Sequence, residues 1–244
     1  MTGLDGGFTL TWVGDEIHGE SPVYPDLFVP GTSHVRLSVL ATWTDIMGGY
    51  LSMEVLNPLI PVTMSLDVHA HRPVPECGSI RSSGRVLSAG RSVATLMVEI
   101  TSDTGDAIAV ATASFMAPDP NRRMPEHLRR DARTPVTIGR DIPFVNVDGC
   151  QQIAPGIVSL SSHATGRNTA GSFSGASLAS AVEDAALSLC PGTTLSMLSM
   201  RYVKPVIDGP AIARAVGNGS ICQVEVRDCA KDDRLAISAI TRSF

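Results

Sequence analysis

The stretch NTAGSFSGASLASAVE, from Asn168 to Glu183, decides the predicted fold of this chain. It begins as a loop of small residues and continues as an apolar helix that carries one carboxylate, Glu183, and runs on through DAALSL. A carboxylate removed from water is costly unless it is paired or has a chemical task. A second stretch, LSVLATWTDIMGGYLSM, places Asp45 in an equally apolar predicted helix. Two such helices indicate an internal repeat.

The two halves of the chain follow the same order of predicted elements. Each has a strand-like opening, a loop, the acid-bearing helix, and then strands with alternating apolar and polar residues, such as VATLMVEI and CQVEVRD. This alternation is typical of half-buried antiparallel strands. Each half has a proline on the strand after its helix, Pro73 or Pro205. The prolines are 132 residues apart and the two acids 138, so the spacing predicts a duplication.

The composition restricts the class of protein. The chain has 244 residues, of which 43% are hydrophobic and 18% charged, with a net charge of −5. This balance predicts a globular protein and argues against a nucleic-acid partner. No apolar run reaches the length of a membrane span, and the N-terminus lacks the features of a signal peptide. The five cysteines show no CxxC spacing, so we expect a reduced, cytoplasmic protein without a metal site.

The repeats set the expected domain boundaries. We expect an N-terminal repeat at residues 1–117, a linker at 118–145 and a C-terminal repeat at 146–244. The linker is rich in proline and arginine and shows no apolar face, which is typical of an exposed connection. Its arginines could attract a phosphate, although charge runs usually only keep a loop solvated. They are Arg122, Arg123, Arg129, Arg130 and Arg133.

The order of elements and the loop–helix sequence resemble the hotdog acyl-CoA thioesterases, in the phenylacetyl-CoA thioesterase-like branch. In that family an Asn precedes a Gly pair by seven positions, a His commonly precedes the pair, and an Asp or Glu follows eight positions later. Asn168, Gly175 and Glu183 match this spacing, while Ala176 replaces the second Gly and Ser174 takes the usual His position. The resemblance implies an α+β double hotdog, in which each repeat has a long central helix wrapped by an antiparallel sheet.

The resemblance also implies a reaction, the hydrolysis of an acyl-CoA thioester to a carboxylic acid and free CoA without a cofactor. In the family a backbone N–H at the helix start polarises the thioester carbonyl, and a carboxylate attacks the carbonyl or activates water. Gly175 and Glu183 are eight residues apart, about 12 Å along a helix. The N–H of Gly175 and the carboxylate of Glu183 therefore cannot act on the same thioester carbonyl. Gly175 is expected to act with Asp45 of the other half.

The corresponding loop of the first half has lost these features. Its matching positions are Pro30, which has no N–H, and Leu37, which prevents the close backbone approach that Gly allows. Family members often have a Ser or Thr on the strand 18 positions after the acid. In the first half that residue is Thr63, which is also ten residues before Pro73, and the position ten residues before Pro205 in the second half is Leu195. We therefore expect one working site and one degenerate site.

The predicted working site combines residues of both halves. Asp45 is expected to act as the nucleophile or the general base. The N–H of Gly175 lies at a helix N-terminus, where the helix dipole favours an anion, and is expected to hold the oxyanion. Asn168 is expected to position the water or the carbonyl. Thr63 and Ser174 are expected to assist through hydroxyl hydrogen bonds.

Several of these residues also have simpler interpretations. Asp45 could be a helix residue that pairs with a neighbouring backbone group or with Arg36. Glu183 could act in the second site, shape the acyl pocket or be a relic of the duplication. Asn168 could be an ordinary turn residue. With a small shift in alignment, His34 could replace the missing family His in the second site.

Other patterns concern ligand binding. His69 and His71 lie on one face of a predicted strand, which favours an exposed strand face over a metal site because no third ligand is evident. The Met-rich stretch LSMLSMRY favours core packing over an acyl pocket. The candidates for lining an acyl pocket are Trp43, Met47, Tyr50 and Leu178.

Two other functions compete with hydrolysis. A hotdog module could bind acyl-CoA or an acyl ligand without cleaving it, and the loss of the family His favours this alternative. A hotdog hydratase or dehydratase would need an Asp and a His about five residues apart in a helix-entry loop, and the sequence shows no such pair. We expect an acyl-CoA partner, no nucleic acid and no membrane. Two such chains could also pair into a homo-oligomer.

Overall fold

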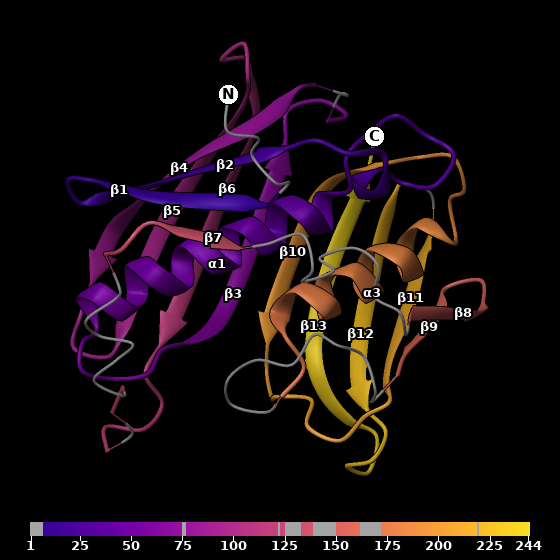
Figure 1. The fold of residues 1–244 in the computed structure, drawn as a ribbon. Helices are drawn as coiled ribbons and strands as arrows, with labels where there is room; N and C mark the ends of the chain where they lie inside the picture. The colour runs from indigo at the N-terminus through magenta and orange to yellow at the C-terminus, as the bar shows by residue number, and fades with distance from the viewer. Residues whose placement is uncertain are drawn as a thin grey trace.

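The computed structural model describes residues 7–74, 77–121, 123–124, 133–138, 150–161, 172–218 and 220–244. Within these ranges a single large antiparallel sheet curves around two helices, which lie side by side on the same face of the sheet (Figure 1). This arrangement confirms the expected α+β architecture of two repeats. Asn168 lies outside the described residues.

The first repeat contains the longer helix. Its elements are β1 (Phe8–Val13), β2 (Glu16–Pro22), the 3-10 turn η1 (Pro25–Leu27), α1 (Leu37–Val55), β3 (Val62–Ala70), β4 (Ser79–Ala89), β5 (Val93–Ser102) and β6 (Ala107–Met116). Helix α1 packs against the inner face of β2, β3, β4, β5 and β6. The apolar stretch around Asp45 is therefore the central helix of this repeat, as predicted.

The second repeat has the same plan with a shorter helix. Its elements are β8 (Cys150–Ala154), β9 (Ile157–Leu160), α3 (Gly175–Leu187), β10 (Leu195–Tyr202), β11 (Ala211–Asn218), β12 (Ile221–Asp228) and β13 (Arg234–Ser243). Between the repeats lies β7 (Val136–Ile138), which pairs with β1. The predicted linker thus contributes a short strand to the sheet, while the proposed domain boundaries stay a prediction.

The strand order shows how the repeats are joined. It runs β7-β1-β2-β4-β5-β6-β3-β10-β13-β12-β11-β9-β8, so the second repeat mirrors the first around the neighbours β3 and β10. These two strands pair antiparallel, from Ser65 opposite Arg201 to His69 opposite Met197. The join is a continuous ladder of hydrogen bonds, so neither repeat has a free sheet edge at the centre of the molecule.

Two details of the strands were not predicted from the sequence. The opening of the first repeat is a hairpin rather than one strand, because Gly14 adopts a left-handed conformation (φ 62°) that turns β1 back onto β2. The strands after α1 are also not a simple meander. Strand β3 pairs with β6 and leaves β4 to pair with β2, an arrangement that strand periodicity alone does not specify.

The core lies between the helices and the inner face of the sheet. Trp43 of α1 is 2% exposed and stacks on Phe8 of β1, with the ring centroids 5.3 Å apart. Met47 and Leu178 are also buried there. These three acyl-pocket candidates are therefore core residues, whereas Tyr50 is half-buried. No helix in the described part of the chain is long and apolar enough to cross a membrane.

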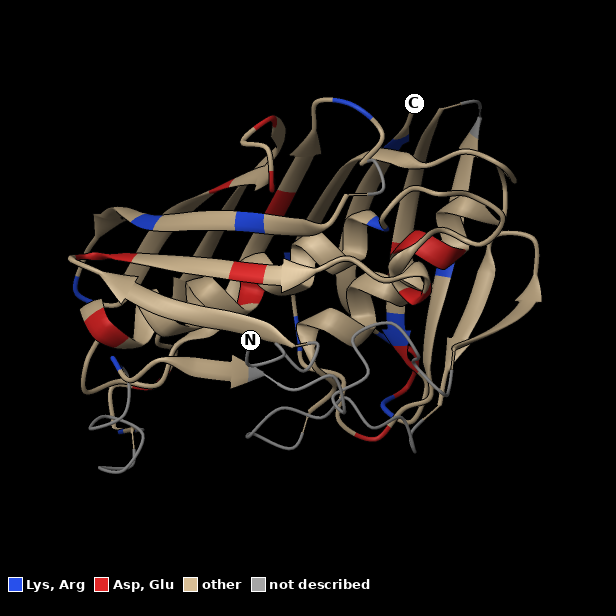
Figure 2. Cartoon of the chain, turned by 45° about the horizontal axis from the view of Figure 1, so that its top comes forward, with Lys and Arg blue, Asp and Glu red and all other residues tan. Residues whose placement is uncertain are grey.

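Charged residues of both signs are scattered over the strands and loops of the described chain (Figure 2). On the outer face of the central strands, residues of opposite charge lie next to each other. Asp67 on β3 accepts hydrogen bonds from Ser199 at 2.5 Å and from Arg201 at 2.8 Å, both on β10. These contacts connect the two repeats through side chains as well as through the backbone.

Candidate active site

Asp45 lies in the middle of α1 and reaches the start of the other helix. The hydroxyl of Thr63, on β3, donates a hydrogen bond to Asp45 Oδ1 at 2.7 Å. A Cβ atom built on Gly175 would lie 2.9 Å from Asp45 Oδ2. The carboxylate of the first repeat and the first residue of α3 are thus in direct proximity. The structure brings together Asp45, Thr63 and Gly175 from three different elements.

The surroundings of Asp45 change its acidity. Burial among the two helices raises the pKa of the Asp45 carboxyl above its ordinary value, and the hydrogen bond from Thr63 acts in the opposite direction and lowers the pKa. Desolvation favours the neutral form of an acid, whereas a donated hydrogen bond favours the charged form. A carboxyl with a raised pKa is a stronger base once it is ionised.

The start of α3 offers backbone donors next to this carboxylate. Ser174 is the N-cap residue, and its Oγ accepts a hydrogen bond from the N–H of Ser177 at 3.2 Å. The carbonyl oxygen of Ser174 accepts the N–H of Leu178 at 3.3 Å. The first amides of a helix have no partner inside the helix, and the helix dipole makes this end attractive to anions. Within the described ranges, no acceptor occupies the amide of Gly175.

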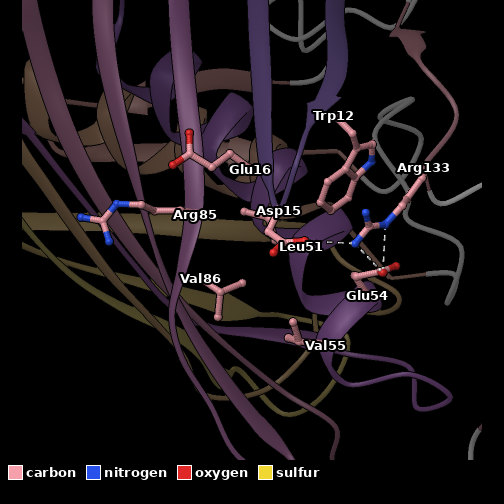
Figure 3. Close-up of a pocket in the computed structure, with 9 residues that line it drawn as sticks. All are labelled: Trp12, Asp15, Glu16, Leu51, Glu54, Val55, Arg85, Val86 and Arg133. Carbon is pink, nitrogen blue, oxygen red and sulfur yellow. Dashed lines mark hydrogen bonds and ion pairs between the residues drawn. The ribbon is translucent and has the colours of Figure 1, made fainter.

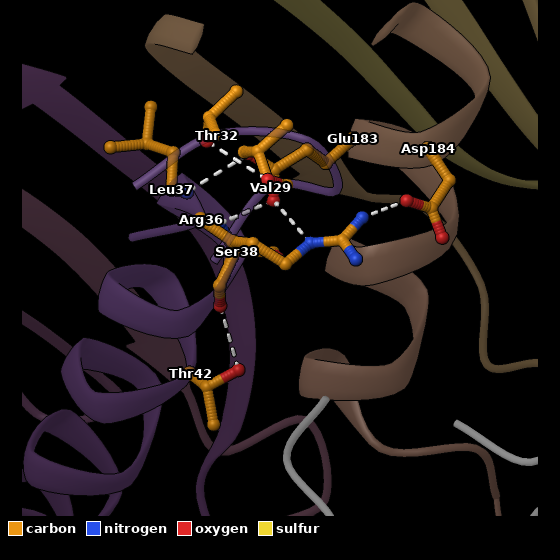
Figure 4. A network of polar contacts seen from close by, with 8 residues as sticks. All are labelled: Val29, Thr32, Arg36, Leu37, Ser38, Thr42, Glu183 and Asp184. Atoms are coloured by element: carbon orange, nitrogen blue, oxygen red, sulfur yellow. Dashed lines mark hydrogen bonds and ion pairs between the residues drawn. The ribbon is translucent and has the colours of Figure 1, made fainter. Parts of the chain in front are cut away.

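Glu183 has a different environment from Asp45 although both are the ninth residue of their helices. Glu183 is fully buried, and its two carboxylate oxygens accept the N–H groups of Leu37 at 2.9 Å and Ser38 at 3.0 Å. These amides belong to the first turn of α1 (Figure 4). Glu183 therefore fills the helix start that corresponds to the open one at Gly175.

Arg36 completes this closed site. Its Nε lies 3.5 Å from Glu183 Oε2, and its Nη2 forms a short ion pair with Asp184 Oδ1 (Figure 4). Arg36 is 6% exposed, so it neutralises the buried Glu183 away from water. Arg36 was one possible partner of Asp45 in the sequence, but in the structure it pairs with Glu183 and Asp184.

The difference between the two helix starts follows from side-chain length. Glu183 has one methylene group more than Asp45, and with it the carboxylate reaches two backbone amides of the facing helix. The shorter Asp45 has one oxygen bound by Thr63 and the other beside Gly175. One helix start thus holds an internal anion, whereas the other can receive an external one.

One residue near Asp45 was not predicted from the sequence. The Tyr202 hydroxyl would lie 3.0 Å from a Cβ atom on Gly175. Tyr202 ends β10, and β10 runs antiparallel to β3, so the end of one strand lies beside the start of the other, where Thr63 stands. The signal that could have found Tyr202 is this antiparallel pairing of the two strands that follow the helices.

A separate pocket of about 530 Å³ lies near the C-terminal end of α1 (Figure 3). Glu54 and Val55 of α1 line it together with Trp12 of β1. Arg133 from the predicted linker donates to Glu54 at 3.0 Å and lies 5.1 Å above the Trp12 ring. This arginine is held by a carboxylate, and three others of the predicted phosphate cluster lie outside the described residues: Arg122, Arg129 and Arg130.

Among the described contacts of Asp45 and Glu183, no hydrogen bond or ion pair involves a histidine singled out in the sequence. The backbone of His34 accepts the N–H of Val29 at 2.9 Å, and the groups that contact Glu183 are Arg36 and the α1 amides. His69 lies on the exposed side of β3. Among the residues that the structure describes, no group of three or more His, Cys, Asp or Glu side chains is arranged to hold a metal ion.

Comparison with known proteins agrees with this architecture. Residues 34–109, which include Asp45 and Thr63, match the sequence model of the Thioesterase superfamily. No curated protein matches the chain in sequence.

Solved structures match over nearly the whole length. An acyl-ACP thioesterase from Bacteroides thetaiotaomicron has a TM-score of 0.66 at 12% identity, covering 94% of this chain and 98% of the other. A 12:0-ACP thioesterase from Umbellularia californica also has a TM-score of 0.66 at 12% identity, covering 96% and 98%. The tesB protein of Mycobacterium avium subsp. paratuberculosis has a TM-score of 0.59 at 13% identity, covering 96% and 94%.

At these identities the likeness establishes the fold alone. The chain has the double-hotdog fold, and its residues 34–109 carry the sequence pattern of the Thioesterase superfamily.

Proposed function

We propose that this chain hydrolyses an acyl-CoA thioester at one composite site between its two repeats. The observation that carries the proposal is the position of the Asp45 carboxylate, whose Oδ2 lies beside the first residue of α3. A base or nucleophile and a backbone donor for the oxyanion are thereby available to one carbonyl group. The family match over residues 34–109 supports the same reaction class.

The two carboxylate oxygens of Asp45 have different roles in this proposal. Oδ1 accepts the hydroxyl of Thr63 and is held in place. Oδ2 is then the oxygen that takes a proton from the attacking water, or that attacks the thioester carbon to form a mixed anhydride, which water then hydrolyses. The N–H of Gly175 stabilises the charge that develops on the carbonyl oxygen. When the C–S bond breaks, the thiolate of CoA leaves, and the carboxylic acid is the second product.

Ser174 has a supporting role in this proposal. Its hydroxyl caps α3 and so holds the helix start that presents Gly175. Glu183 is assigned no catalytic role, because both its oxygens already accept amides of α1. Asn168 stays a predicted positioning residue for the water or the carbonyl.

Ligand binding without hydrolysis is the alternative function. Ser174 favours this alternative. It stands at the usual His position of the family, and its hydroxyl caps a helix. A protein of this kind would retain acyl-CoA and release no thiol.

The test is a panel of acyl-CoA and acyl-ACP thioesters, followed with a free-thiol reagent, for the wild type, Asp45→Asn and Glu183→Gln. We expect Asp45→Asn to lose at least about 100-fold in kcat, whereas Glu183→Gln keeps its kcat per folded molecule. Hydrolysis of acyl-ACP alone would change the proposed carrier but not the reaction. Binding of acyl-CoA by a wild type that cleaves no thioester would refute hydrolysis and support the alternative.

A further inference from the structure

The hydroxyl of Tyr202 occupies a place that the proposed reaction leaves unassigned. A Cβ atom on Gly175 would meet two polar groups, Asp45 Oδ2 at 2.9 Å and the Tyr202 hydroxyl at 3.0 Å. The phenol and the carboxylate therefore both lie beside the same helix start. One group comes from the first repeat and the other from the second.

The phenol has few acceptors of its own. Its one side-chain hydrogen bond among the described residues goes to the sulfur of Met200, at 3.9 Å, and a thioether is a weak acceptor. Burial raises the pKa of the Tyr202 phenol well above its ordinary value, and the charge of Asp45 raises it further. The hydroxyl thus keeps its proton at neutral pH and is available as a donor.

The duplication supplies an internal comparison. With the spacing of 132 residues that relates the strand prolines, Tyr202 corresponds to Ala70 and Leu195 corresponds to Thr63. The open helix start therefore has a hydroxyl at both strand positions, whereas the closed one has alanine and leucine. Of the two helix starts, the open one is therefore the one that has a phenol beside it.

We propose that Tyr202 is a second oxyanion donor, which hydrogen-bonds the thioester carbonyl oxygen together with the N–H of Gly175. This inference rests on the proposed thioesterase function. When the water oxygen bonds to the carbonyl carbon, Asp45 takes the water proton, and the C=O electron pair moves to the oxygen held by Tyr202. The phenol donates a hydrogen bond but transfers no proton. Collapse of the intermediate breaks the C–S bond, and the leaving thiolate takes the proton from Asp45.

The experiment compares Tyr202→Phe with Tyr24→Phe, a matched loss of one phenol hydroxyl at a residue just before η1, far along the chain from β10. We expect Tyr202→Phe to lower kcat about 10- to 1,000-fold, in the range seen for loss of one oxyanion donor. Its KM is expected to stay within about twofold and its melting temperature to stay unchanged. Tyr24→Phe is expected to match the wild type in kcat.

Each result has a distinct meaning. An active wild type with Tyr202→Phe at more than half its kcat would overturn the role of Tyr202 while leaving the thioesterase proposal intact. A wild type that cleaves no thioester would overturn both. A lowered melting temperature with kcat restored on cooling would show that the hydroxyl stabilises the fold rather than the transition state, and would also overturn the inference.

Discussion

Replacing Glu183 with glutamine tests whether this acid holds the fold together rather than the substrate. The carboxylate accepts two amides of α1, at 2.9 and 3.0 Å, and lies beside the buried Arg36. A glutamine can accept only one of these donors through its single oxygen, and its NH₂ group would face the other donor. The variant therefore leaves a buried N–H unsatisfied and Arg36 with only Asp184 as a partner.

The magnitude follows from these losses. A hydrogen bond to a charged group contributes about 1.5–3 kcal/mol, and breaking a buried ion pair from one side costs about 3–5 kcal/mol. We expect Glu183→Gln to lower the free energy of unfolding by about 3–5 kcal/mol. For a chain of this size that corresponds to a fall in melting temperature of roughly 6–20 °C.

The assay is urea unfolding followed by circular dichroism, with Asp184→Asn as the control. Asp184 contacts the same Arg36, but its side chain is 31% exposed, so its loss is expected to cost about 1 kcal/mol or less. A Glu183→Gln protein within 1 kcal/mol of the wild type would refute the structural role of Glu183. Such a result, joined with a large loss of kcat, would instead indicate a second catalytic acid.

Three further predictions concern the open site. Gly175→Ala places a methyl group against the side-chain ends of Asp45 and Tyr202 rather than against backbone, so we expect kcat to fall at least about 10-fold with little change in melting temperature. A large fall in melting temperature with kcat unchanged would contradict this. Thr63→Val removes the hydrogen bond that lowers the Asp45 pKa, so the acid limb of the pH profile of kcat/KM should move to higher pH. An acid limb at the same pH as in the wild type would contradict the assignment of Asp45 as the base. Burial makes folded Asp45 bind its proton more tightly than unfolded Asp45, so stability falls as pH rises above the unfolded pKa. Asp45→Asn, which cannot ionise, is expected to be about 1 kcal/mol more stable than the wild type at pH 7, and a less stable variant in urea unfolding would disprove it.

Much of the fold could be predicted from the sequence because the signals are local and occur twice. The apolar stretches around Asp45 and Glu183 are helices in both repeats, and the alternating strands follow them. The proximity of Asp45 to Gly175 could also be anticipated, because eight residues along a helix exclude the acid of the same helix. The geometry of one regular element was sufficient for that argument.

The remaining features depend on contacts between distant elements. Tyr202 approaches Asp45 only because β3 and β10 pair antiparallel, and a single strand carries no information about its partner. Glu183 fills the start of α1 because its side chain is long enough to reach two amides across the helix interface. The sequence showed an acid at the right position, but whether that acid meets backbone donors or open space depends on the packing of both helices.

The filled helix start has a consequence for how such a protein can evolve. In a symmetric dimer every substitution appears in both subunits, so an acid that closes one helix start would close the other as well. A single chain that carries both copies is free of this constraint. Here one copy contributes Glu183 and the stabilising contacts of a permanently bound internal anion. The other has the shorter Asp45, so one copy holds the helices together and the other leaves a helix start open.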